Sequence, residues 1–228
     1  HCWQHRRLGQ IADGLVLERP EANRALDALT PAALGQQPVM LFARNELDLA
    51  RAQGLADENK LKLISVGSGF EYRVVNSLNL ATPLVLPLNF PAAPEIDDPE
   101  KALDVSLAEL EHWQYAPFNP RIVSEHKIRF ALSAVGMETP EANFAPNLRK
   151  AIRYGLSEAN ALAALTEVPA AMINMPQMGT LKPGSLASFS ISDDNFFTDD
   201  KAKIYEMWVD GSREIIVPLD AAALEGRW

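Results

Sequence analysis

The chain has few of the residues that characterise several common classes of protein. It carries one cysteine, Cys2, in 228 residues, so an internal disulfide is excluded. Its 30 acidic residues outnumber its 21 lysines and arginines, which disfavours nucleic acid because phosphate contacts depend on basic side chains. No apolar run approaches the roughly 20 residues that a membrane-spanning helix needs. We therefore expect neither a nucleic-acid partner nor a membrane partner.

Histidine, the commonest metal ligand, is also scarce, with four copies in the chain. His1 and His5 have the i, i+4 spacing of a helical metal site, but no glutamate follows His1, and we interpret both as terminal residues. His112 lies in an acidic segment and is interpreted as a surface or packing residue. His126 joins an expected helix to an expected strand, and we interpret it as structural. The histidines alone predict no metal site.

What is present is ordinary for a globular protein: 47% apolar and 22% charged residues. The chain does not begin with methionine and shows no signal peptide, so we expect it to be a fragment of a longer polypeptide.

Short apolar runs alternate with segments of helical spacing from residue 38 onward. We expect strands over 39–43, 61–66, 83–86 and 127–133, and helices over 45–59, 71–80, 99–113, 117–125 and 144–154. Asn45 and Ser157 are placed to cap helices, Gly155 to end one, and Pro169 to begin a short helix to residue 173. This alternation predicts βαβ units and a parallel sheet, an α/β fold.

The pattern changes after residue 178. Short strands are expected over 186–192, 204–209 and 213–217, and Asp210-Gly211 predicts a two-residue hairpin turn. We therefore divide the chain into a helical lead-in segment (1–37), a β/α portion (38–178) and a C-terminal β portion (179–228).

Several motifs carry a resemblance to a known family. They are the turn 179–187, GTLKPGSLA, the helical run 156–166, LSEANALAALT, and the stretches DPEKALDVSLAEL and RFALSAVG. These resemble the C-terminal end of the amidohydrolases, and more narrowly the imidazolonepropionase-like members and one half of bacterial tandem amidohydrolases. The resemblance implies that 38–178 is the C-terminal half of a (β/α)8 TIM barrel, strands five to eight, and that 179–228 is part of a small β-sandwich.

The resemblance also implies a metal site whose ligands this chain lacks. Relatives place a histidine on strand five, a histidine on strand six and an aspartate on strand eight. The matching positions here hold Phe42, Gly69 and Val135, none of which can ligate. We therefore predict no catalytic residue and no cofactor in this segment, and Zn or another divalent metal if the parent protein is active. A second interpretation of Gly67-Ser-Gly69 is a phosphate-binding turn at a helix N-terminus.

Five polar residues are predicted to lie at the mouth of such a barrel, where the strands end. They are candidates for ligand binding, with helix capping and surface charge as the alternative: Arg44, Asn45, Glu46, Glu71 and Ser133.

Two functions follow from these expectations. The first is a degenerate, non-catalytic amidohydrolase-like domain with a structural or binding role. The alternative is a metal-dependent hydrolase of C–N bonds whose ligands come mainly from a missing N-terminal half. Expected partners are the remainder of the barrel, a second amidohydrolase domain or another copy of the chain, because a half barrel leaves sheet edges open. Similar tandem proteins are often exported, which favours the periplasm.

Overall fold

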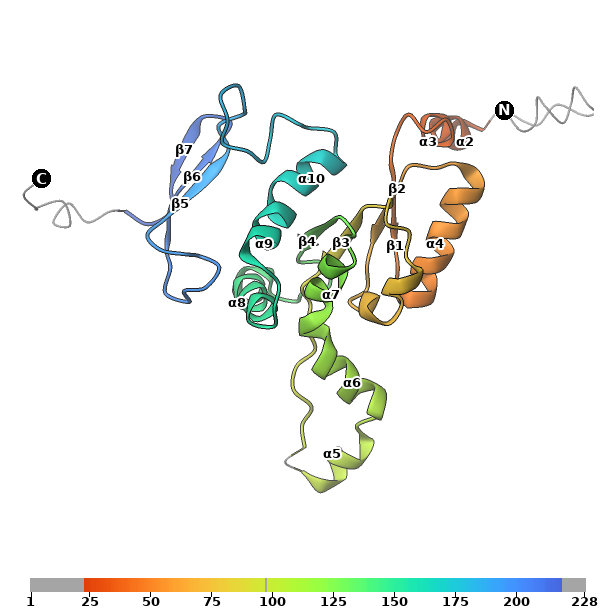
Figure 1. Cartoon of the computed structure of the whole chain (residues 1–228), viewed down its shortest axis with the longest axis vertical. Helices are drawn as coiled ribbons and strands as arrows, with labels where there is room; N and C mark the ends of the chain where they lie inside the picture. Colours follow the sequence, from red (N-terminus) through yellow and green to blue (C-terminus); the bar gives the residue numbers. More distant parts are fainter. Residues whose placement is uncertain (1–22, 97, 219–228) are drawn as a thin grey trace, which may run out of the picture.

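A computed structural model describes residues 23–96 and 98–218 and contains two separate sheets (Figure 1). The larger sheet is parallel and has the order β1-β2-β3-β4, as the alternation of strands and helices predicted. Its strands are β1 (Val39–Phe42), β2 (Leu63–Val66), β3 (Leu84–Pro87) and β4 (Phe130–Ser133).

Helical segments connect these strands and follow the last of them. Before β1 come α2 (Arg24–Ala28) and α3 (Thr30–Ala33), and between β1 and β2 lies α4 (Glu46–Asn59). The connection from β3 to β4 contains α5 (Pro99–Asp104), α6 (Leu107–Tyr115), the 3-10 turn η3 (Ala116–Phe118) and α7 (Asn119–Glu125). Three helices follow β4: α8 (Pro140–Arg153), α9 (Glu158–Leu165) and α10 (Glu167–Met172). No helix within the described ranges is long and apolar enough to cross a membrane.

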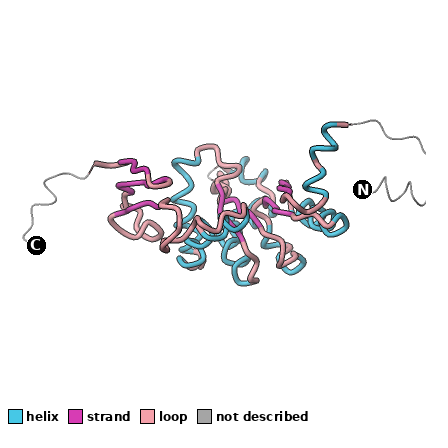
Figure 2. The backbone as a smooth tube through the Cα atoms, turned by 90° about the horizontal axis from the view of Figure 1, so that it is seen from above, coloured by secondary structure: helices cyan, strands magenta, loops and turns pink. Residues whose placement is uncertain are grey.

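The main hydrophobic core lies between one face of the parallel sheet and its helices. Strand residues alternate between the two faces, so the register of the sheet assigns each side chain to a face. Leu84, Leu86, Phe130 and Leu132 share the helix-covered face and belong to one buried cluster with Leu49 of α4, Val123 of α7 and Leu148 of α8. In the view of Figure 2, most helices accordingly lie on one side of the strands.

The second face of the sheet carries the alternate residues of the same strands. By register these are Met40, Phe42, Ile64, Val66, Val85, Pro87, Ala131 and Ser133. The residues of β2 to β4 are buried or half-buried, whereas Met40 and Phe42 on β1 are 49% and 65% exposed. The apolar surface that remains open on this face is therefore at the β1 edge of the sheet.

The predicted caps are confirmed by their hydrogen bonds. Asn45 Oδ1 accepts from Asp48 N at 2.9 Å and begins α4. Ser157 Oγ accepts from Asn160 N at 3.2 Å and begins α9. Gly155 follows the end of α8 with a φ of 102°, the left-handed conformation that favours glycine.

The helix predicted over 71–80 does not form. The segment instead makes two single 3-10 turns, η1 (Glu71–Arg73) and η2 (Val75–Ser77), and then a loop. The sequence here contains two valines, two asparagines and a serine, residues with low intrinsic helix propensity. The side chain of Glu71 also folds back onto the preceding loop and accepts N–H bonds there, which favours a tight turn over a continuous helix.

Two further boundaries differ from the predictions. The helix predicted over 99–113 is split into α5 and α6 because Ser106 begins a new helix with a complete capping box to Glu109. The helix predicted from residue 144 begins earlier, with Pro140 in its first turn, where the missing N–H costs no hydrogen bond.

The smaller sheet is antiparallel and contains the three strands expected after residue 178. Its order is β5 (Phe189–Ser192), β6 (Ile204–Val209) and β7 (Ser212–Ile215). Asp210 and Gly211, with φ of 48° and 81°, form the predicted turn between β6 and β7. Buried Glu206 on β6 accepts hydrogen bonds from Trp208 Nε1 and from the guanidinium of Arg213 on β7.

Candidate functional site

The carboxyl ends of the four parallel strands meet at one edge of the larger sheet, which we call the carboxyl edge. Parallel α/β proteins place their reacting and ligand-binding groups at this edge, because the loops that leave it converge there. All five predicted ligand-binding candidates lie on or just after strand ends, or at the first helical residues beyond them.

Three of these candidates follow β1 and interact with nearby charged or backbone groups. The exposed Arg44 side chain contacts Asp48, with Nε 3.4 Å from Oδ2. Asn45 caps α4, and Glu46 Oε1 lies 3.4 Å from Arg73 Nη1. In the structure all three therefore have the helix-capping and surface-charge roles that the sequence analysis gave as the alternative to ligand binding. Ligand binding by these residues stays a prediction.

Glu71 is held more tightly than any other candidate. It is fully buried, and its Oε1 accepts from Ser68 N at 2.6 Å and from Gly69 N at 3.1 Å. Its Oε2 accepts from Asn119 Nδ2 at 2.6 Å, and Asn119 Oδ1 accepts in turn from Tyr72 N at 2.8 Å. The carboxylate therefore joins the loop after β2 to α7.

The same contacts bear on the phosphate-binding interpretation of the 67–69 turn. A phosphate at this turn would need free backbone N–H groups, and those of Ser68 and Gly69 already donate to Glu71. A Cβ on Gly67 would lie 2.3 Å from Glu71 Oε1, so glycine is required for the carboxylate to enter the turn. An internal carboxylate thus takes the place that an anion would occupy.

The fifth candidate, Ser133, ends β4 on the second face of the sheet. Its half-buried side chain has Oγ 3.4 Å from the carbonyl oxygen of Leu86 on the neighbouring strand. Among the five candidates the structure pairs none with another. It joins Glu46 to Arg73, and Glu71 to Asn119, from segments distant in sequence.

An aromatic cluster at the carboxyl edge includes one of the four histidines. His112 of α6 stacks on Phe70, with ring centroids 3.7 Å apart and planes 19° apart. Its Nδ1 lies 3.4 Å from the Tyr72 hydroxyl, which accepts from Arg73 Nε at 3.2 Å. Because that hydroxyl accepts from Arg73, its own proton is available for Nδ1. His112 is therefore a packing residue, and it reaches Gly69 from a helix remote in sequence.

Burial is the main cause of the pKa shifts of His112 and Tyr72. Burial lowers the pKa of His112, and the nearby positive charge of Arg73 lowers it further. Burial also raises the pKa of Tyr72, against the opposing effect of Arg73. Both shifts favour the neutral form of the side chain.

His126 has the structural role predicted for it. Its Nδ1 lies 2.8 Å from the carbonyl oxygen of Ile122 and its Nε2 lies 3.1 Å from Asn76 Oδ1, so it ties the end of α7 to η2. His1 and His5 lie outside the described residues.

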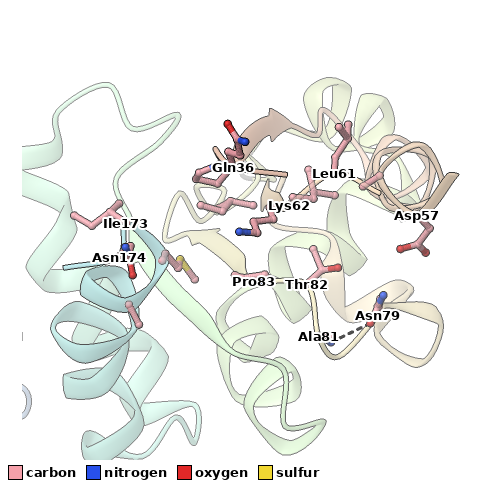
Figure 3. Close-up of a pocket in the computed structure, with 16 residues that line it drawn as sticks. Gln36, Asp57, Leu61, Lys62, Asn79, Ala81, Thr82, Pro83, Ile173 and Asn174 are labelled. Carbon is pink, nitrogen blue, oxygen red and sulfur yellow. Dashed lines mark hydrogen bonds between the residues drawn. The ribbon is translucent and has the colours of Figure 1, made fainter. Parts of the chain in front are cut away.

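A cavity of about 580 Å³ lies at the opposite edge of the sheet, where the strands begin (Figure 3). The segments that start β2 and β3 line one side, and Ile173 and Asn174 after α10 line the other. Lys62 extends into the space between these sides, while Asn79 accepts from the N–H of Ala81 within its own loop. In parallel α/β proteins the ligand-binding loops follow the carboxyl ends of the strands, and this cavity lies at the amino ends. We therefore do not assign the candidate site to this cavity.

No protein-family model matches this sequence, and no curated protein matches it. Solved structures do match it in fold. An amidohydrolase from Thermotoga maritima aligns with a TM-score of 0.68 and 19% identity, over 92% of this chain and 51% of that chain. A prolidase solved with N-methylphosphonate-L-proline gives a TM-score of 0.59 and 16% identity, over 82% of this chain and 47% of that chain.

The chain resembles the amidohydrolases in fold.

A further amidohydrolase aligns with a TM-score of 0.57 and 15% identity, over 82% of this chain. The chain spans about half the length of the amidohydrolases it matches. The resemblance inferred from the sequence motifs is thereby confirmed at the level of the fold.

The three residues that the sequence analysis matched to metal-ligand positions do not have the side-chain chemistry to hold a divalent cation. Phe42 ends β1 and is 65% exposed, Gly69 follows β2 with a φ of 91°, and Val135 follows β4 and is 41% exposed. None of these side chains offers a lone pair. In the described part of the chain, no group of three or more histidine, cysteine, aspartate or glutamate residues is placed to hold a metal ion.

Proposed function

We propose that this segment is a degenerate amidohydrolase-like half barrel that contributes structure or a binding surface and no metal ligand. In this proposal residues 38–178 supply strands five to eight of a (β/α)8 barrel, and 179–228 supply part of the β-sandwich. The observation that carries the proposal is the composition of the second face of the sheet and of the strand ends beyond it. Phe42, Gly69 and Val135 stand where, by the resemblance, hydrolytic relatives need imidazole and carboxylate groups.

The open β1 edge supports the expected partner. Met40 and Phe42 expose apolar side chains there, and an unpaired parallel strand presents free N–H and C=O groups to a further strand. We propose that the rest of the barrel, from the parent chain, from a second amidohydrolase domain or from another copy, pairs with this edge.

The alternative is a metal-dependent hydrolase of C–N bonds. The likeness in fold to amidohydrolases and to a prolidase favours it, because those names describe hydrolysis of such bonds. In that case Zn or another divalent metal would be held mainly by residues of the other half.

Metal analysis of the full-length protein separates the two functions. Under the proposal, elemental analysis finds no stoichiometric divalent metal in the barrel that contains this segment. One divalent metal for each copy of this segment would refute the proposal and favour the alternative.

A further inference from the structure

A second cavity, of about 720 Å³, lies at the carboxyl ends of β3 and β4. It lies between the loops that follow these strands, Trp113 of α6 and one side of α8. Its lining includes none of Phe42, Gly69 and Val135, although Gly136 in the lining directly follows Val135.

One side of α8 supplies a row of polar groups to this cavity. Asn143, Asn147 and Lys150 follow one another at the i, i+4, i+7 spacing of a single helix side, while Leu148 and Ala151 point to the core. Asn147 Nδ2 donates to the carbonyl oxygen of Leu88 at 2.7 Å. This bond fixes the side chain and leaves its Oδ1 available to accept a hydrogen bond from another group. The side of α8 that faces the cavity thus carries amides and a cation, whereas the side that faces the core is apolar.

The cation of this row has no anionic partner in the described part of the chain. The half-buried Lys150 ammonium lies 5.8 Å from the centre of the Phe90 ring, a cation–π contact that does not occupy its N–H donors. On the opposite side, Gly136 has a φ of 80°, and a Cβ there would lie 2.9 Å from Asn89 Nδ2. Glycine therefore leaves room for the amide of Asn89 at the mouth of the cavity.

An apolar depression of about 300 Å³ adjoins this polar cavity. The two share Pro91, Ala92 and Trp113, and the depression continues to Pro94 and Val105, with the carboxylates of Asp104 and Glu109 also in its lining. Trp113 is 39% exposed, so part of its indole is accessible to a ligand in the two cavities. A ligand lying across both would meet a cation and amides at one end and apolar side chains at the other.

We propose that these joined cavities bind a small carboxylate with an apolar tail. The carboxylate is held by Lys150 and the amide N–H groups of Asn89, and the tail lies against Trp113 and Pro91. Glu138 in the polar cavity, and Asp104 and Glu109 in the adjoining depression, oppose the binding of an anion, so the carboxylate is placed at the Lys150 end. This inference does not depend on whether the protein hydrolyses anything, because it uses no metal and no residue of the second face.

The test is isothermal titration of the full-length protein with 4-phenylbutyrate, with 4-phenylbutanamide as the uncharged analogue. We expect the acid to bind and Lys150→Met to weaken it about tenfold, the size of one charge-assisted hydrogen bond. Lys201→Met removes the same charge from an exposed loop outside the cavity and leaves the affinity unchanged. Glu138→Gln strengthens binding several-fold, and the amide binds at least tenfold more weakly than the acid.

The proposal is overturned if the acid does not bind, if acid and amide bind equally, or if Lys150→Met and Lys201→Met have the same effect. Circular dichroism establishes that each variant folds. Should Lys150→Met not fold, Glu138→Gln decides, since unchanged or weakened binding of the acid contradicts the assigned carboxylate position. Failure of any of these tests leaves the metal content of the protein, and with it the proposed function, unaffected.

Discussion

The contact between Gly67 and the buried Glu71 carboxylate predicts that substitutions at these two positions are strongly non-additive. The Cβ of Gly67→Ala would lie 2.3 Å from Oε1 and 2.7 Å from Cδ of Glu71, well inside van der Waals contact. The carboxylate would have to leave the turn and would lose its bonds from Ser68 N and Gly69 N. Gly67 itself does not have a positive φ, so the alanine backbone is not strained.

The expected magnitudes follow from the bonds at stake. A hydrogen bond to a charged acceptor contributes roughly 1.5–3 kcal/mol, so Gly67→Ala should lower the free energy of unfolding by about 3 kcal/mol. Glu71→Ala removes all three bonds and leaves buried donors unpaired, a loss of about 4 kcal/mol. In the double variant the clash is absent and the same bonds are lost only once, so the total should stay near 4 kcal/mol rather than reach about 7 kcal/mol.

Urea unfolding of the full-length protein, followed by far-ultraviolet circular dichroism, measures the three free energies. The double-mutant cycle should give a coupling energy of about 3 kcal/mol between the two positions. If the effects add to within about 0.5 kcal/mol, the carboxylate does not occupy the turn and the reasoning is wrong.

Two other predictions use single variants. Gly54 lies on the exposed side of α4, where an added Cβ would meet nothing within 4 Å. Gly54→Ala should therefore raise the free energy of unfolding by about 0.5–1 kcal/mol in the same assay. A lower free energy of unfolding would contradict the open environment of this position. Because burial and Arg73 hold the pKa of His112 below its ordinary value, the unfolded chain binds the proton more readily, and stability is lost as pH falls below about 6.5. His112→Phe keeps the stacking on Phe70 and should flatten that part of the stability–pH curve, whereas a curve of unchanged slope would show that His112 is not shielded from water.

Some parts of the structure follow from local sequence. The strands at 39–42 and 63–66 and the helix between them were predicted because apolar spacing, the Asn45 cap and the flanking polar residues all indicate the same elements. Asp210-Gly211 predicted its hairpin because both residues tolerate a positive φ. In each case the groups that decide the structure lie within a few residues of one another.

Other parts depend on residues distant in sequence. The failure of the helix at 71–80 reflects the bonds of Glu71 to its own loop and to Asn119, 48 positions away. The place of His112 beside Phe70 and Gly69 results from the path of the long connection between β3 and β4, which no periodicity shows. A complete capping box at Ser106 was visible in the sequence as Ser106 followed by Glu109, and that signal would have located the break between α5 and α6.

The features of the candidate site can be divided in the same way, into those that follow from the sequence and those that depend on tertiary structure. The absence of metal-ligating side chains at Phe42, Gly69 and Val135 was readable from the sequence, because an apolar or missing side chain cannot ligate in any fold. Tertiary structure alone decided that Glu71 is buried in the turn after β2, and that Asn147 and Lys150 share a cavity with Asn89 and Trp113. The physical reason is that donor chemistry belongs to each residue, whereas burial and neighbours are set by how distant segments pack.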